Sequence, residues 1–123
     1  MAIQESGEMY LETILVLSQK MDEVHAVDVG REMGFSKPSV SRAVGILKEE
    51  GCIELGGRGE LLLTKKGKKI AENIYERHTV ITELLQAIGV SKKTAIEDAC
   101  RVEHYISSET FKALKKHRDE KMH

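Results

Sequence analysis

Apolar residues recur at helical spacing along most of the chain. Tyr10, Ile14 and Leu17 lie at i, i+4 and i+7 and predict a helix over residues 5–20. Similar stripes predict further helices over residues 27–33, 37–50, 65–88, 91–106 and 109–116. Two short apolar runs, residues 52–55 and 60–63, flank a glycine-rich turn and predict a β-hairpin. We therefore expect a mainly α-helical fold with one small hairpin and a frayed, charged end over residues 117–123.

The breaks between these segments carry capping signals. Ser36 is a favourable N-cap, and Pro38 falls in the first helical turn, where its missing N–H is harmless. Thr64 and Ser91 take the same position before two later helices. Gly30 lies inside a predicted helix, where glycine costs about 1 kcal/mol relative to alanine. We expect the close approach of a second helix to explain why glycine is tolerated there.

Residues 27–63 follow the order of a winged helix-turn-helix. A short helix, a break at Gly34 and a second helix with a polar, basic outer face precede the hairpin, whose turn carries Arg58 between glycines. The helix pair alone would also fit an ordinary helical hairpin, but the β-hairpin that follows favours the winged form. In that form the second helix enters the major groove of double-stranded DNA, and the wing contacts phosphate or the minor groove.

The candidate DNA-binding residues lie on the second helix and the wing. They are Ser36, Lys37, Pro38, Ser39, Ser41, Arg42 and Arg58. Ser39, Ser41 and Arg42 are candidates for contacts with base edges, and Lys37 and Arg58 for contacts with phosphate. The charge distribution agrees, because residues 36–69 carry +4 although the whole chain carries −1.

Composition limits the class of protein. No apolar run reaches membrane-spanning length, and the N-terminus lacks the pattern of a signal peptide, so we expect a cytoplasmic protein that does not enter a membrane. Cys52 and Cys100 are then expected to be reduced. Residues 65–116 carry more aliphatic surface than a small monomer can bury, which predicts a homodimer. Two recognition helices would match a two-fold symmetric DNA operator.

Cys100, Glu103 and His104 place a thiol, a carboxylate and an imidazole at i, i+3 and i+4. On a helix all three leave one face, beside a separate apolar stripe, and offer rigidly held ligands for a transition metal. The alternative is a buried cysteine next to a surface Glu–His pair.

Three further residues are ambiguous. Met9 and Glu12 share a face of the first helix, but core packing would explain the first and a solvated surface the second. His78 lies on an apolar stripe, where a histidine is more often part of the core than a ligand.

The order of these motifs resembles the diphtheria toxin repressor family of metal-dependent repressors, which includes iron-dependent regulators and the manganese transport regulator. The resemblance covers residues 5–117 and rests on residues 8–12, the helix-turn-helix, residues 63–67, Arg77-His78 and residues 100–104. It implies a short two-domain form, with a winged helix-turn-helix DNA-binding domain over residues 1–64 and a helical metal-binding and dimerisation domain over residues 65–123. The SH3-like third domain of longer members is not expected.

The resemblance also implies a primary metal site. In the iron-responsive branch this site is formed by residues that match Met9, Cys100, Glu103 and His104. In the manganese-responsive branch an Asp replaces the Met and a Glu replaces the Cys. The primary set of this chain is therefore of the iron type.

The auxiliary ligands follow a different branch. Glu12 and His78 match ligands of the manganese-responsive members. Thr82 and Ile96 stand where the iron branch has a carboxylate and a histidine, so a full iron-type ancillary site is not expected.

Donor chemistry favours Fe²⁺, because thioether and thiolate are softer than the oxygens that Mn²⁺ prefers. Mn²⁺ is the alternative, and Co²⁺, Ni²⁺ or Zn²⁺ should substitute in vitro. The predicted function is Fe²⁺-responsive repression of metal-uptake genes, with no enzymatic activity and no small-molecule substrate. Three alternatives stay open: a manganese-responsive member, a metal-independent winged-helix regulator in which Cys100 is structural or senses oxidation, and a small metalloenzyme or metal-storage protein.

Overall fold

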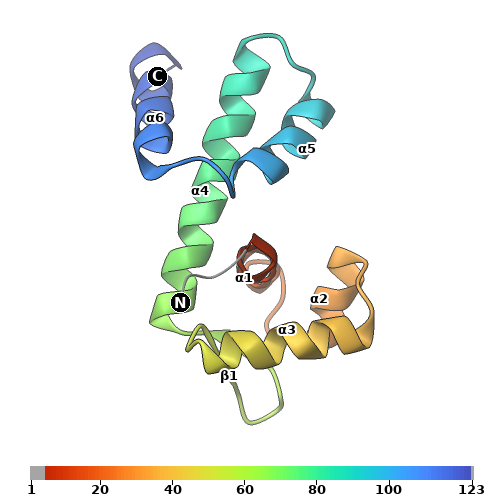
Figure 1. Ribbon diagram of the computed structural model, residues 1–123. Coiled ribbons are helices and arrows are strands. Elements are labelled where there is room, and N and C mark those ends of the chain that lie inside the picture. The colour runs from red at the N-terminus through yellow and green to blue at the C-terminus, as the bar shows by residue number, and fades with distance from the viewer. Residues whose placement is uncertain (1–4, 123) are drawn as a thin grey trace. The chain divides into compact units, whose positions relative to one another are not determined.

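The computed structural model describes residues 5–122. Within that range the elements are α1 (Glu5–Ser18), α2 (Ala26–Met33), α3 (Lys37–Glu49), β1 (Ile53–Leu55), β2 (Leu61–Leu63), α4 (Lys65–Ala87), α5 (Lys92–Val102) and α6 (Ser108–Met122) (Figure 1). The predicted mainly helical fold with one small hairpin is confirmed. The chain forms two compact units, one ending at Glu72 and the other beginning at Asn73, inside α4. None of the helices described here is long and apolar enough to cross a membrane.

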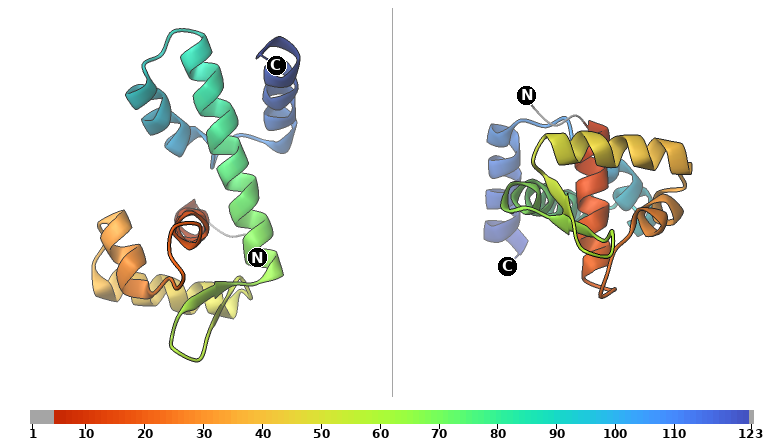
Figure 2. Two further views of the ribbon diagram at one scale, coloured as in Figure 1. Left: turned by 180° about the vertical axis from the view of Figure 1, so that it is seen from behind. Right: turned by 90° about the horizontal axis from the view of Figure 1, so that it is seen from below.

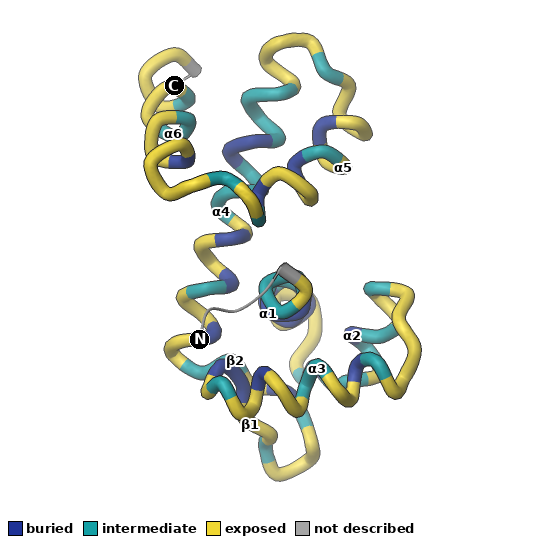
Figure 3. The backbone as a smooth tube through the Cα atoms, viewed as in Figure 1, coloured by how far each residue is buried: buried dark blue, intermediate teal, exposed yellow. Residues whose placement is uncertain are grey.

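The core of the first unit is aliphatic. Leu11 and Ile14, on the apolar stripe predicted for the first helix, are fully buried. Val29 of α2, Val40 of α3 and Ile53 of β1 pack into the same cluster. Each such side chain contributes about 1.5–3 kcal/mol relative to an exposed one. This core anchors α3, whose outer face stays exposed, as does most of the hairpin loop (Figure 3).

The two helices of the helix-turn-helix match the predicted bounds to within one residue, and the second begins where predicted. The Ser36 side chain accepts a hydrogen bond from the Ser39 N–H at 3.3 Å, and Pro38 lies in the first turn of α3. A Cβ built on Gly30 would lie 3.3 Å from Val40 Cγ2, tighter than ordinary van der Waals contact. The close approach of α3 therefore explains the glycine in α2, as expected from the sequence.

The wing is a short antiparallel hairpin in which Ile53 pairs with Leu63 and Leu55 with Leu61. Each strand is one residue shorter than predicted. The Leu61 N–H also donates to the Val24 carbonyl at 2.7 Å, so the segment before α2 supports the second strand. The loop projects beyond the strands (Figure 2), which gives the winged helix-turn-helix arrangement that the sequence predicts.

The junction between the wing and α4 admits only glycine at one position. The Thr64 hydroxyl donates to the Gly51 carbonyl at 2.6 Å and accepts from the Gly67 N–H at 3.1 Å, so Thr64 caps α4 as expected. A Cβ at Gly67 would overlap the carbonyl oxygen of Cys52. Any side chain at position 67 would push the hairpin away from α4.

The second unit consists of the later part of α4 with α5 and α6. Val80 and Ala99 are fully buried, and Phe111 of α6 is nearly so. Two ion pairs join α6 to α4. They are Lys115–Glu76 at 2.9 Å and Arg118–Glu83 at 3.4 Å. The Ser91 side chain accepts from the Thr94 N–H at 3.4 Å and caps α5, as predicted.

Two helix ends differ from the prediction by more than two residues. The helix expected over residues 91–106 ends at Val102, because residues 103–106 form a turn whose carbonyls bond to a side chain of α4. The last helix was expected to end at residue 116, with a frayed end after it. Instead α6 continues to Met122, and the Arg118–Glu83 ion pair holds its later turns. The domain division at residues 64/65 stays a prediction.

Candidate functional site

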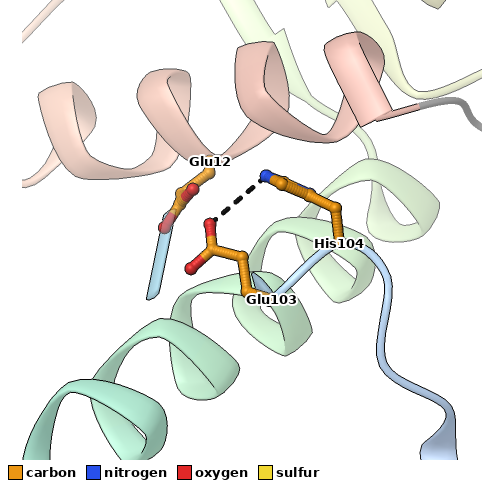
Figure 4. A group of neighbouring side chains, drawn as sticks. All are labelled: Glu12, Glu103 and His104. Carbon is orange, nitrogen blue, oxygen red and sulfur yellow. Dashed lines mark ion pairs between the residues drawn. The ribbon is translucent and has the colours of Figure 1, made fainter. Parts of the chain in front are cut away.

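Four predicted metal ligands lie in the second unit and contact one another around Glu103. His78 Nδ1 on α4 lies 3.0 Å from Glu103 Oε2 and 3.8 Å from Cys100 Sγ on α5. His104 Nε2 lies 3.4 Å from Glu103 Oε1 (Figure 4). We call these four residues the ligand cluster. Its donors are two imidazoles, one carboxylate and one thiol, a set suited to a divalent transition metal.

Burial sets the electrostatics of the ligand cluster. Glu103 is only 1% exposed, and a buried carboxylate is stable only with partners that compensate its charge. His78, which is partly exposed, supplies such a partner at 3.0 Å, and the buried His104 side chain lies beside the other carboxylate oxygen. Cys100 is exposed and Cys52 is buried, and both are free thiols. The cluster thus combines a buried carboxyl group with an accessible sulfur.

The contacts of His78 raise its pKa to about 10. The largest cause is the hydrogen bond with Cys100, followed by the hydrogen bond with Glu103, and burial opposes both. His78 therefore carries a proton at neutral pH in the metal-free protein. A metal that binds through this imidazole must displace that proton. Cys100 and Glu103 give His78 two polar partners, and its role as a metal ligand stays a prediction.

The three residues of the predicted single helical face are arranged differently. Cys100 lies in the last turn of α5, and Glu103 is the C-cap with φ −57° and ψ −26°. His104 lies in the turn that follows the helix. The prediction that all three project from one continuous helix is therefore wrong for His104. Its imidazole faces the Glu103 carboxylate because the chain turns after Val102.

The remaining predicted ligands belong to the first unit. Met9 and Glu12 are one turn apart on α1, and both are partly buried. Glu12 is also drawn in Figure 4. In the second unit, Thr82 and Ile96 offer a hydroxyl and an alkyl group, and Ile96 is 37% exposed. The expected absence of a full iron-type ancillary site stays a prediction. The membership of Met9 and Glu12 in a metal site stays a prediction.

The predicted DNA-binding residues lie at the start of α3 and on the wing. Lys37, Ser41 and Arg42 are exposed. The Ser36 hydroxyl donates to the Ser39 hydroxyl at 2.9 Å, and the same Ser36 side chain caps the helix. Ser36 thus has a structural role at the helix start, whereas the three exposed side chains are available to a ligand.

Arg58, the arginine at the tip of the wing, already has a partner. Its Nη1 lies 2.7 Å from Glu23 Oε2, although the arginine side chain is 79% exposed. The other oxygen of Glu23 lies 3.2 Å from His25 Nε2. Sequence reasoning missed Glu23, because no local pattern links it to a residue 35 positions later.

The chain matches two family descriptions that together cover nearly all of it. Residues 2–61 match "Iron dependent repressor, N-terminal DNA binding domain". Residues 64–120 match "Iron dependent repressor, metal binding and dimerisation domain".

Named relatives agree with these matches. The chain is 34% identical to the transcriptional regulator MntR of Escherichia coli O157:H7 over 106 residues, which are 86% of this chain and 68% of that protein. It is 29% identical to the iron-dependent repressor IdeR of Mycobacterium tuberculosis over 113 residues, 91% of this chain and 49% of that protein. The solved structure of the manganese regulator SloR superposes with a TM-score of 0.81 at 28% identity, covering 97% of this chain and 55% of that one. The chain thus spans about half the length of the last two proteins.

Proposed function

This chain belongs to the iron-dependent repressor family, the family of the diphtheria toxin repressor, and from that membership we propose that it is a metal-activated repressor of transcription. Members of the family are DNA-binding regulators rather than enzymes. One observation carries the proposal for this chain: His78, Cys100, Glu103 and His104 converge in the same polypeptide as a winged helix-turn-helix. A regulator of this kind works on DNA in the cytoplasm.

The primary metal site in this proposal consists of Met9, Cys100, Glu103 and His104, with Glu12 and His78 as auxiliary ligands. The short distances among the four cluster residues support their part of the assignment. Met9 and Glu12 would add ligands from α1, in the unit that holds the DNA-reading helix. Metal binding would then couple the two units.

Fe²⁺ is the physiological metal we propose. The exposed thiol of Cys100 contacts His78 and is a softer donor than those that Mn²⁺ prefers. Mn²⁺ is the second candidate, because MntR, at 34% identity, and the manganese regulator SloR are among the relatives. Co²⁺, Ni²⁺ and Zn²⁺ should replace either ion in vitro.

The mechanism follows from the charges in the ligand cluster. Without metal, the raised pKa of His78 places a positive charge beside Glu103 and Cys100. When bound, a divalent cation would supply positive charge there instead. His78 would then give up its extra proton to act as a ligand, and Glu103, Cys100 and His104 would hold the ion together with residues of α1. Metal and DNA would support each other's binding reciprocally, typically by about 1–3 kcal/mol.

A homodimer completes the proposal. Several apolar side chains of the second unit are exposed, including Ile88 at 78% and Tyr105 at 73%. A second copy that covers this surface would place two α3 helices on one duplex. A two-fold symmetric operator upstream of metal-uptake genes is the target we propose.

The test measures metal-dependent DNA binding. Duplexes selected from a randomised library with metal-loaded protein would be titrated by fluorescence anisotropy in chelator, Fe²⁺ or Mn²⁺, with metal stoichiometry measured in parallel. We expect tight binding only with metal, and a large loss in Cys100→Ala. Glu97→Ala, an exposed acidic position one turn earlier on α5, is the matched control and should behave as wild type.

Other outcomes would support other functions. Equal DNA affinity in chelator and metal would contradict a metal switch, and sensitivity to peroxide under those conditions would favour Cys100 as a thiol sensor. Full metal activation in Cys100→Ala would show that the primary site is assigned wrongly. Absence of any sequence-specific DNA binding would favour a metalloenzyme or a metal-storage protein instead.

A further inference from the structure

Arg77 makes contacts that the metal site and the DNA-reading unit do not explain. It precedes His78 on α4 and is partly buried. Its Nη1 donates to two backbone carbonyls, that of Glu103 at 3.1 Å and that of Ile106 at 2.8 Å. Its guanidinium carbon lies 5.3 Å from the centre of the Phe111 ring. One side chain thus joins α4, the turn after α5 and the first part of α6.

The Glu103 carbonyl belongs to the C-cap of α5, whereas the Ile106 carbonyl lies in the link before α6. The last carbonyls of a helix have no partner within it, and they carry the negative end of the helix dipole. A cation from a neighbouring helix therefore stabilises the Glu103 carbonyl, and the same guanidinium nitrogen also gives the Ile106 carbonyl a donor. The planar guanidinium suits this role, because it stays charged and offers several donors in fixed directions. Arg77 accounts for the turn that replaces the predicted continuation of α5.

The same turn carries two residues of the ligand cluster. The N–H of Glu103 donates to the Ala99 carbonyl at 3.0 Å, and the Glu103 carbonyl accepts from Arg77. Both sides of the Glu103 backbone are therefore held, while its carboxylate meets His78, the residue next to Arg77 on α4. One turn of α4 thus fixes both the backbone and the side chain of Glu103.

We infer that Arg77 is a positioning residue for the metal site, holding the 103–106 turn so that Glu103 and His104 face His78. This inference rests on the proposed function. Arg77 is not itself a ligand, because a guanidinium has no lone pair to offer a metal. A purely structural role, in which Arg77 only fastens α6 to α4, is the competing explanation.

The experiment uses Co²⁺ as the probe, because its visible bands report ligand geometry and a thiolate ligand adds a charge-transfer band. Wild type, Arg77→Ala and Arg77→Lys would be titrated with Co²⁺, and urea unfolding would be followed separately in chelator. Lys115→Ala is the matched control, because it breaks another contact between α6 and α4 that does not involve the turn.

We expect Arg77→Ala to weaken Co²⁺ binding by about 10–100-fold, as is typical when a residue that orients metal ligands is lost. Arg77→Lys should be intermediate, with visible bands that differ from wild type at saturation. Lys115→Ala should match wild type in affinity and spectrum. If Arg77→Ala does not fold, the Co²⁺ affinity and spectrum of Arg77→Lys are compared with those of wild type instead.

Two outcomes are contrary and distinguishable. Wild-type Co²⁺ affinity and spectrum in the folded Arg77 variants, with only a lower urea midpoint, would show that Arg77 is structural and overturn the inference alone. Absence of saturable Co²⁺ binding by wild type would overturn the proposed function and the inference with it.

Discussion

The wing turn, residues 56–59, and the ligand turn, residues 103–106, each involve one arginine, and the two arginines differ. Arg58 projects from the wing turn itself, is mostly exposed and pairs with one carboxylate, that of Glu23. Arg77 reaches the ligand turn from another helix, is partly buried and donates to two backbone carbonyls. One contact joins two surface side chains, whereas the other determines the path of the backbone.

The two arginines differ in how easily each can exchange its present partner for another. An exposed ion pair contributes about 0–1 kcal/mol, so a DNA phosphate can replace Glu23 as the partner of Arg58. Leaving the Glu103 and Ile106 carbonyls without their donor costs more, about 1–3 kcal/mol for each group that stays buried. The wing turn is thus suited to changing partners, and the ligand turn to keeping one geometry.

The largest expected effect is on the ligand turn. Glu103→Gln keeps the shape of the side chain but replaces one acceptor oxygen of the carboxyl group with an NH2 donor. Metal affinity should fall by more than about 100-fold, beyond the usual loss for residues that only orient ligands. Isothermal titration with Mn²⁺ measures it. Glu60→Gln changes a carboxylate next to the wing turn and should leave metal affinity unchanged; an equal loss in both variants would contradict the separation of the two turns.

The second prediction concerns pH. Because the pKa of His78 is raised to about 10, the metal-free protein holds this proton at pH 7 and must release it on binding. Affinity for Mn²⁺ should therefore rise by up to about tenfold per pH unit between pH 6.5 and 8.5 for this proton. In His78→Gln the rise should be shallower by that amount. An unchanged slope would show that His78 is not a ligand.

The same pKa predicts how stability depends on pH. A histidine whose pKa is higher in the folded state stabilises that state fully below its ordinary pKa, near 6.5, and this contribution is lost as the pH rises through about 10. The metal-free protein should therefore become easier to unfold with urea from pH 7 to pH 10. His78→Gln should lose less stability over that range, and a parallel decline in both proteins would contradict the assignment.

A smaller effect is expected at the wing. Arg58→Ala should weaken DNA binding by a similar factor for all sequences, because a phosphate contact carries little sequence information. The slope of log affinity against log salt should decrease by about 1 for each lost contact. Anisotropy titrations at several salt concentrations measure this. A loss confined to the selected operator would indicate base contact instead.

The smallest expected effect has the opposite sign. Glu23→Gln releases Arg58 from its carboxylate partner, and DNA affinity should rise by at most about fivefold, the equivalent of 1 kcal/mol. In the Arg58→Ala background the same substitution should have no effect through this pair, so a double-mutant cycle isolates the coupling. Equal gains in both backgrounds would point to a general charge effect.

Capping and periodicity explain how much of the fold was predictable. Ser36 and Ser91 each accept from an N–H three residues later, and such contacts are visible in the sequence. Gly30 was also interpretable, because a glycine inside a helix indicates a close neighbour. The end of α5 was not, because the residues after Val102 carry no local stop signal, and two of their carbonyls accept from Arg77, which is distant in sequence.

The candidate site shows the same limit. The donor groups could be predicted from Cys100, Glu103 and His104, which lie within five positions of the sequence. The arrangement of these groups in space could not be predicted. His78 looked like a core residue by its spacing and was linked to the site only through the family resemblance. Its contacts with Cys100 and Glu103 make it part of the ligand cluster.

The sequence by itself determined the order of helices, the glycine-tipped wing and the donor types, because helix periodicity and capping act over three or four neighbouring residues. Only the tertiary structure decided that Arg58 meets Glu23, that His78 meets Glu103 and that Arg77 donates to the carbonyls after α5. All of these contacts join residues that are 25 to 35 positions apart in the sequence. Their existence depends on how the helices pack, and packing is a property of the folded chain rather than of any local pattern.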